Sequence, residues 1–191
     1  MESTRESSMT PAAGRVLEAA SRLFYERGIR AVGMDALADE AGVTKVTIYK
    51  NFGSKDGLIA AYLRARDERW RRWLVEAVER RAGTPRERLL AVFDALGEWL
   101  GGQEGLRGCA FVNASTEITD VSHPARAVIE DQKQWMREYF RGLASEAGVE
   151  EPEELAERLM ILYEGATVNF TMHIGTEPTR QAREIAEALL K

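Results

Sequence analysis

The sequence has few of the residues on which covalent and metal-dependent functions rely. Its 191 residues include one cysteine, Cys109, and two histidines. A single cysteine excludes a disulfide within the chain and a metal site built from several cysteines. No spacing of a nucleophile and a general base is recognisable along the chain. We therefore expect no catalytic residues, no metal site and no cofactor.

Long apolar runs are missing as well. No stretch approaches the roughly 18 consecutive apolar residues of a membrane-spanning helix. The first ten residues, MESTRESSMT, are polar and carry two acids, and no apolar segment of a signal peptide follows them. From these patterns we expect a disordered tail over residues 1–10, no membrane partner and a cytoplasmic location.

Charge is unevenly distributed between the front and the rear of the chain. The formal net charge is -5. Residues 1–72 hold 13 Lys and Arg against 10 Asp and Glu, a net charge of +3, and residues 73–191 hold 13 against 21, a net charge of -8. A mildly basic front joined to an acidic rear indicates one part that faces a polyanion and another with a different task.

Apolar residues recur with helical spacing along almost the whole chain, and no segment has the alternation of a strand. Capping residues followed by proline mark several helix starts, among them Thr10-Pro11 and Thr84-Pro85. The sequence predicts an all-α fold, with helices over about 11–27, 34–41, 45–52, 55–81, 85–100, 106–119, 124–148 and 152–175, and a last helix from 178. The central part of the helix over 152–175 is apolar around much of its circumference, so we expect it to be buried on several sides.

The segment GVTKVTIYKNFGSKDGL, residues 42–58, concentrates three lysines in an acidic protein. A short helix that ends at Gly42 and another that begins at Lys45 form a helix-turn-helix layout. In that layout the second helix lies in the major groove of DNA, with its first residues at the base edges. We therefore expect Lys45, Val46, Thr47 and, one turn later, Lys50 to contact bases.

Hydroxyl, amide and ammonium groups in the same segment are suited to phosphate oxygens, which fix register without reading sequence. Tyr49, Asn51 and Lys55 are the candidates, together with Thr47. Spacing alone leaves alternatives open. The lysines also fit a solvated helix face, Tyr49 also fits a half-buried packing position, and Ile48 fits the core better than a DNA contact.

Residues 19–58, AASRLFYERGIRAVGMDALADEAGVTKVTIYKNFGSKDGL, resemble the DNA-binding domain of the tetracycline-repressor (TetR) family of bacterial transcription regulators. The resemblance implies a three-helix helix-turn-helix domain over residues 11–56 and a helical ligand-binding and dimerisation domain over 57–191. It supports base contacts from Lys45, Val46, Thr47 and Lys50, and it implies phosphate contacts from Thr44, Tyr49, Asn51 and Lys55.

The chain departs from the family pattern at two positions. Gly33 stands where the family usually has a serine or threonine that caps the second helix and often touches phosphate. Val46 replaces a common glycine and adds bulk at the floor of the groove. The second departure is expected to narrow the sequence preference of the protein.

The resemblance implies a small-molecule pocket between the helices of the rear domain, and the segment 107–148 looks like the pocket region of many such regulators. Pockets combine apolar walls with a few polar groups. The candidates for the walls are Phe93, Trp99, Phe111, Asn113, Trp135, Tyr163 and Phe170. Each aromatic residue also fits an ordinary core position, and the amide of Asn113 fits either a ligand or a backbone carbonyl. Cys109 fits a small buried apolar residue better than an oxidant sensor.

The family implies a homodimer held by the last two helices and a palindromic DNA operator as partner. We expect a repressor that an unknown small-molecule effector releases from the operator. Two alternatives stay open: a TetR-type activator without DNA release, and a helical protein–protein interaction module that leaves the lysines solvated.

Overall fold

The computed structural model describes residues 9–81 and 83–190, and over these ranges it contains helices and no strand. The predicted all-α fold is confirmed. Of the predicted tail, residues 1–8 lie outside the described residues. The helices are α1 (Pro11–Arg27), α2 (Met34–Ala41), α3 (Lys45–Phe52), α4 (Lys55–Arg81), α5 (Pro85–Gly101), the single 3-10 turn η1 (Gln103–Gly105), α6 (Ala110–Glu117), α7 (Pro124–Glu146), α8 (Pro152–Thr171) and α9 (Pro178–Leu189).

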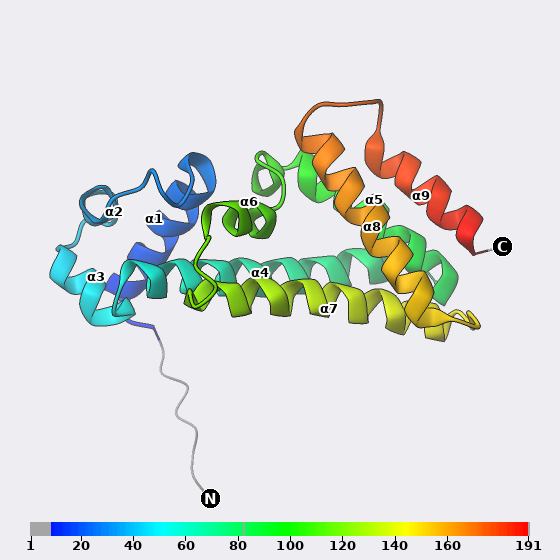
Figure 1. The fold of residues 1–191 in the computed structure, drawn as a ribbon, viewed down its shortest axis with the longest axis horizontal. Helices are drawn as coiled ribbons and strands as arrows, with labels where there is room; N and C mark the ends of the chain where they lie inside the picture. The colour runs from blue at the N-terminus through cyan, green and yellow to red at the C-terminus, as the bar shows by residue number, and fades with distance from the viewer. Residues whose placement is uncertain (1–8, 82, 191) are drawn as a thin grey trace, which may run out of the picture.

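Helices α1, α2 and α3 form a unit at one end of the molecule (Figure 1). The Thr10 side chain accepts a hydrogen bond from the Ala13 backbone N–H at the start of α1. Gly42 ends α2 in the left-handed conformation, with φ of 61°, which glycine adopts without steric cost. The short connection that follows turns the chain directly into α3. These local signals explain why the sequence predicted the bounds of all three helices.

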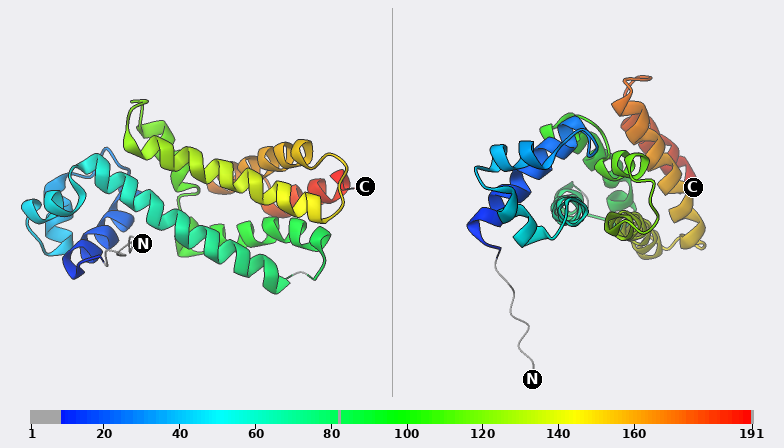
Figure 2. Two further views of the ribbon diagram at one scale, coloured as in Figure 1. Left: turned by 90° about the horizontal axis from the view of Figure 1, so that it is seen from below. Right: turned by 60° about the vertical axis from the view of Figure 1, so that its left-hand side comes forward.

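The 27-residue helix α4 belongs to two separate cores. Its first turns, with Leu58 and Leu63, pack against α1 in a front core that also contains Leu23, Leu37 and Ile48. Its later turns, from Trp70 to Val78, pack in a rear core with α5, α7 and α8. Helices α4 and α7 run side by side over most of their lengths (Figures 1 and 2). A rigid helix therefore connects the front unit to the rear bundle.

Helix α6 packs with the front core although it lies far from that core in sequence. Phe111, Ala114 and Ile118 are buried in the same cluster as the residues of α1. The Glu117 carboxylate accepts a hydrogen bond of 2.8 Å from the Arg30 backbone N–H, in the connection after α1. The segment around α6 thus forms a second link between the front unit and the rear bundle.

Two predicted helix bounds are wrong. The helix predicted over 106–119 begins only at Ala110, because Gly108 has a φ of 69° and Cys109 is extended, and neither conformation belongs to an α-helix. The helix predicted over 152–175 ends at Thr171, and the chain then turns at His173, which has a φ of 55°. The expected burial of that helix on several sides is also wrong for the single chain, because Ile161 is 74% exposed.

Candidate functional site

Helix α3 is anchored by one apolar residue and exposes most of its other side chains. Ile48 is completely buried in the front core. Val46, which the sequence predicted as a base contact, is 75% exposed, and Lys45, Tyr49 and Lys50 are also exposed. Because burial of Ile48 fixes the rotation of the helix about its axis, these four side chains share an outward surface. The geometry is that of a helix available to enter a groove.

Lys45 has an ionic partner within the protein. Its ammonium group lies 2.8 Å from the Asp35 carboxylate of α2. This hydrogen bond raises the pKa of Lys45, and the charge of Asp35 adds to the effect. Both side chains are exposed, so a pair of this kind is weak and easily exchanged for another anion. Lys45 is therefore held near the start of α3 without being withdrawn from the surface.

Thr44, Thr47 and Asn51 make hydrogen bonds along α3 itself. The Thr44 hydroxyl oxygen accepts a bond of 3.2 Å from the Thr47 backbone N–H and so caps the helix. The Asn51 amide donates a bond of 2.7 Å to the Thr47 carbonyl oxygen. The Thr44 and Asn51 side chains are exposed and Thr47 is half-buried. The local bonds order the polar side chains that were predicted to meet phosphates.

Lys55 is placed differently from the other predicted phosphate contacts. Its ammonium group donates a hydrogen bond of 2.8 Å to the Ile29 carbonyl oxygen and lies 6.0 Å from the centre of the Phe24 ring. Burial lowers the pKa of Lys55. The carbonyl offsets the unfavourable position of a cation in the first turn of a helix. In this arrangement Lys55 joins α4 to the connection after α1, and a phosphate would have to compete with that carbonyl.

A small cavity lies in the rear part of the molecule, between α4, α5, α7, α8 and the start of α6. Its volume is about 30 Å³, above the roughly 10–15 Å³ of cavity volume that one water molecule needs. Three of the seven predicted pocket residues line it: Trp99, Phe111 and Tyr163. The other lining residues are Arg66, Trp70, Leu96, Leu100, Gly108, Cys109, Ala110, Gln132 and Thr167.

The other four predicted pocket residues do not line this cavity. Phe93 is completely buried against Phe140 in the rear core, with ring centres 5.9 Å apart. Trp135 is half-buried and stacks on Tyr139, and Phe170 is a half-buried residue packed on the rear core. The Asn113 amide donates a hydrogen bond of 2.8 Å to the Arg107 carbonyl oxygen, so its partner is a backbone group.

Sequence reasoning missed two buried polar residues of the cavity wall. Arg66 of α4 is 5% exposed and Gln132 of α7 is 2% exposed. Both occupy gaps in an apolar stripe. Position 66 lies between Leu63 and Trp70, and position 132 lies between Ile129 and Met136, where a period of 3.6 places a side chain inward. A polar residue at an inward position of an apolar stripe was the sequence signal that could have identified both residues.

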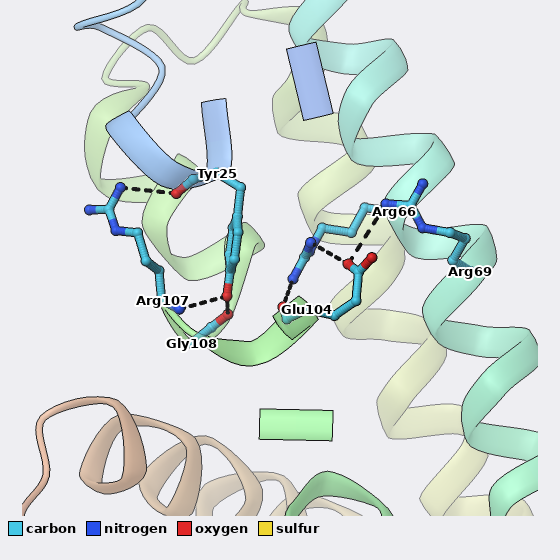
Figure 3. A network of polar contacts seen from close by, with 6 residues as sticks. All are labelled: Tyr25, Arg66, Arg69, Glu104, Arg107 and Gly108. Atoms are coloured by element: carbon cyan, nitrogen blue, oxygen red, sulfur yellow. Dashed lines mark hydrogen bonds and ion pairs between the residues drawn. The ribbon is translucent and has the colours of Figure 1, made fainter. Parts of the chain in front are cut away.

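A network of polar contacts connects the wall of the cavity to α1 (Figure 3). The Tyr25 hydroxyl donates a hydrogen bond of 2.9 Å to the Gly108 carbonyl oxygen and accepts one of 2.8 Å from the Arg107 backbone N–H. The Arg66 guanidinium lies 4.1 Å from the centre of the Tyr25 ring. It also donates a hydrogen bond of 2.9 Å to the Glu104 carboxylate. We call Tyr25, Arg66, Glu104, Arg107 and Gly108 the α1 latch.

The Arg107 side chain ends the same network at the last turn of α1. Its guanidinium donates hydrogen bonds of 3.0 and 2.9 Å to the Tyr25 and Glu26 carbonyl oxygens. A cation at the carboxyl end of a helix also interacts favourably with the helix dipole. Since Arg66 and Gly108 line the cavity as well, one set of residues contacts both the cavity and the front unit.

Large apolar side chains are exposed on α8, on α9 and in the segment between the two helices. Exposed apolar residues that gather on a monomer indicate an interaction surface. The six residues, which we call the α8–α9 face, are Ile161, Val168, Met172, Ile174, Ile185 and Leu189. A shallow hollow on this side is lined by Ile161, Gly165, Ile174 and Ile185, among others.

Within the described ranges, no helix is long and apolar enough to cross a membrane. The same part of the chain holds no group of three or more His, Cys, Asp or Glu side chains arranged to bind a metal ion.

The sequence matches two known protein families. Residues 16–62 match the family of bacterial regulatory proteins named tetR, and residues 85–186 match the tetracyclin repressor-like C-terminal domain. A crystal structure of a TetR-family transcriptional regulator from Streptomyces coelicolor is 30% identical, covers 94% of each chain and has a TM-score of 0.83. The reduced form of NemR from Escherichia coli shares the fold. It is 22% identical, the match covers 93% of this chain and 96% of NemR, and the TM-score is 0.79.

The curated relatives differ in how much of the chain they match. The transcriptional activator FasR of Mycolicibacterium smegmatis is 50% identical over 50 residues, which cover 26% of this chain and only 23% of FasR. The transcriptional repressor DhaR of a Mycobacterium species is 26% identical over 189 residues, 95% of this chain and 93% of DhaR. The chain belongs to the TetR family of bacterial transcriptional regulators, which are DNA-binding transcription factors and not enzymes.

Proposed function

We propose that the protein is a repressor that binds a palindromic operator as a homodimer and leaves it when a small molecule occupies the cavity described above. The observation that carries the DNA-binding part is the outward surface of α3. Lys45, Val46, Tyr49 and Lys50 are exposed together, while Ile48 is fully buried. We infer that Lys45, Val46, Thr47 and Lys50 meet bases, and that Thr44, Tyr49, Asn51 and Lys55 meet phosphates.

The proposed dimer uses the α8–α9 face. A second copy would remove Ile161, Val168 and Ile185 from water, which is favourable at roughly 25 cal/mol per Å² of apolar surface. A two-fold axis through this face pairs the same residues of both copies. Two α3 helices related by that axis would read half-sites about 34–36 Å apart, one turn of DNA. In this proposal residues 11–56 bind DNA and residues 57–191 bind the effector and dimerise.

Repression is favoured over activation by the relatives that match over most of the chain. DhaR is named a repressor and aligns over 95% of this chain. NemR is named a repressor and aligns over 87%. The match to the activator FasR is confined to 50 residues, 26% of this chain, and so has less weight.

We propose that α4 and the α1 latch couple ligand binding in the cavity to release of the protein from the operator. Helix α4 belongs to both cores, and Arg66 and Gly108 touch both the cavity and Tyr25. A ligand that prefers a different arrangement of this wall would favour a dimer whose α3 helices are wrongly spaced for the operator. A coupling free energy of roughly 1–3 kcal/mol would weaken DNA binding about 5- to 150-fold.

The test is a selection of genomic fragments by the purified full-length protein, with sequencing of the retained DNA, repeated with Tyr49→Ala. We expect a palindrome to be enriched by the wild type, and the variant to retain much less of this DNA at the same protein concentration. Binding of the enriched site should fall steeply with salt, because phosphate neutralisation releases counterions. No enrichment at low salt, or equal retention of the palindrome by Tyr49→Ala, would contradict the proposal and favour the interaction module.

A further inference from the structure

The buried amide of Gln132 is a polar group in the cavity wall whose carbonyl lacks a partner. The side chain is 2% exposed, and its Oε1 has no hydrogen-bond partner among the residues that the structure describes. A buried amide oxygen without a partner is unfavourable. Gln132 lines the cavity, so an enlargement of the cavity around a bound molecule would bring that molecule against the amide. This oxygen accepts hydrogen bonds and therefore selects a ligand that donates one.

Four of the eleven other residues that line the cavity are aromatic: Trp70, Trp99, Phe111 and Tyr163. The Trp70 and Trp99 ring centres are 5.0 Å apart in an edge-to-face arrangement, and the Trp70 and Tyr163 ring centres are 6.5 Å apart. Phe111 lines the cavity from α6. Aromatic side chains present both ring faces and ring edges, which favour a further ring in offset or edge-to-face contact over a saturated one.

The charge of the wall is already compensated. Arg66 is the one charged residue that lines the cavity among the described residues. Its guanidinium binds the Glu104 carboxylate at 2.9 Å and stacks on Tyr25 at 4.1 Å. An anionic ligand would have to displace Glu104 from this pair and also lose its own hydration in a buried site. The wall therefore favours a neutral molecule.

From these three features, and on the basis of the function proposed above, we propose that the effector is a neutral aromatic molecule of one or two rings whose O–H or N–H group donates a hydrogen bond to Gln132 Oε1. The class includes phenols and indoles. The present cavity of about 30 Å³ is too small for a ring, since an apolar cavity that holds benzene measures about 150 Å³. Binding therefore requires the wall to move, and the wall includes Arg66 and Gly108 of the α1 latch.

The test is calorimetric titration of the full-length protein, without DNA, with phenol, anisole, cyclohexanol and benzoate. Phenol and anisole differ in the donor, phenol and cyclohexanol in the ring, and phenol and benzoate in the charge. We expect phenol to bind at least about tenfold more tightly than anisole, the effect of one hydrogen bond to a buried group. Phenol should also bind more tightly than cyclohexanol, because of the ring, and more tightly than benzoate, because of the charge. Indole should likewise exceed 1-methylindole.

Gln132→Met tests the named acceptor. It keeps the length of the side chain and removes the amide, so phenol and anisole should then bind within about twofold of each other. The matched control is Gln134→Met on the same helix, where the side chain is exposed, and it should keep the preference of about tenfold. If Gln132→Met does not fold, the relative affinities of the wild-type protein for the four probes test the proposal.

Equal binding of phenol and anisole to the wild type, a preference that survives Gln132→Met, tighter binding of benzoate, or no binding of any probe would overturn the proposal. Because these titrations contain no DNA, they are independent of release. Addition of phenol to the operator complex tests the proposed function separately: a protein that binds phenol through Gln132 and stays on the operator would contradict release alone.

Discussion

The Tyr25 hydroxyl donates a hydrogen bond of 2.9 Å to the Gly108 carbonyl oxygen and thereby joins the last turn of α1 to the segment that precedes α6. The same hydroxyl accepts a bond from the Arg107 backbone N–H. Burial raises the pKa of Tyr25, so the phenol stays protonated and able to donate at neutral pH. One side chain of the DNA-binding unit thus rests on the wall of the candidate effector cavity.

Tyr25→Phe should weaken communication between the cavity and the operator. The change removes two hydrogen bonds and should lower the free energy of unfolding by about 1–3 kcal/mol. The affinity for the operator in the absence of effector should change little. The loss of operator affinity that an effector causes should become smaller. Fluorescence anisotropy with labelled operator measures both. Tyr139→Phe, which alters a half-buried tyrosine of α7 outside the latch, is the control; equal release in the two variants would contradict this role.

Ile48→Ala should abolish operator binding by loosening α3. Truncation of a fully buried isoleucine costs about 2–5 kcal/mol, and Ile48 is the one residue of α3 that is fully buried. Val46→Ala, at an exposed position, should change the stability by no more than about 0.5 kcal/mol but alter the operator preference. Thermal unfolding and operator binding of the two variants give the comparison. A stable Ile48→Ala protein with normal DNA binding would contradict the anchoring role.

Lys45→Ala and Lys50→Ala should relax the sequence preference, whereas Tyr49→Ala should weaken binding to all sequences alike. A lost base contact costs about 1–3 kcal/mol at the base concerned, and a lost phosphate contact lowers affinity uniformly. Binding to a panel of operators with single base changes separates these outcomes. Uniform weakening by all three variants would contradict the division of roles between bases and phosphates.

Ile161→Glu should yield a monomer with weak operator binding. The substitution places a charge in the centre of the α8–α9 face, where an unpaired buried carboxylate is strongly unfavourable. Val121→Glu is the control, because Val121 is 84% exposed and lies outside that face. Sedimentation equilibrium gives the oligomeric state. A dimer that persists with Ile161→Glu would exclude this face as the interface.

Glu87, at the start of α5, should make the stability of the protein depend on pH in the acidic range. Its carboxylate accepts a hydrogen bond of 2.9 Å from the Thr84 backbone N–H, which lowers the pKa of Glu87 below its ordinary value of 4.5. A lowered folded-state pKa contributes stability that is complete above pH 4.5 and is lost as the pH falls through the folded-state value. Glu87→Gln should therefore be less stable than the wild type at neutral pH and approach it in acid. A stability difference that does not change with pH would contradict this prediction.

Much of the fold could be predicted because its signals are local. Thr10 and Thr84 precede prolines and cap their helices as expected, and the ends of α2 and α3 follow from glycines. Helix α3 was predictable for the same reason, since Lys45 to Lys50 are consecutive. The orientation of its side chains depended only on which residue, Ile48, was buried.

The cavity was less predictable because it is made of residues brought together from five helices. Trp99, Phe111 and Tyr163 were predicted and line it, whereas Phe93 and Asn113 have other partners. The sequence pattern shows that an aromatic residue in an amphipathic stripe faces the interior. Whether it then borders a cavity or packs on another ring depends on the helix that lies beside it. Lys55 was likewise predicted from its position in a motif, but its partner in this structure is a carbonyl 26 residues away.

The sequence by itself determined the helices, their caps, the helix-turn-helix and the family, because each depends on residues within one or two turns of each other or on a continuous motif. The tertiary structure alone decided that Arg66 and Gln132 are buried, that Tyr25 touches Gly108 and that the α8–α9 face is exposed. These features depend on which helix faces which, and a side chain acquires its desolvation and its partners only when that packing is formed.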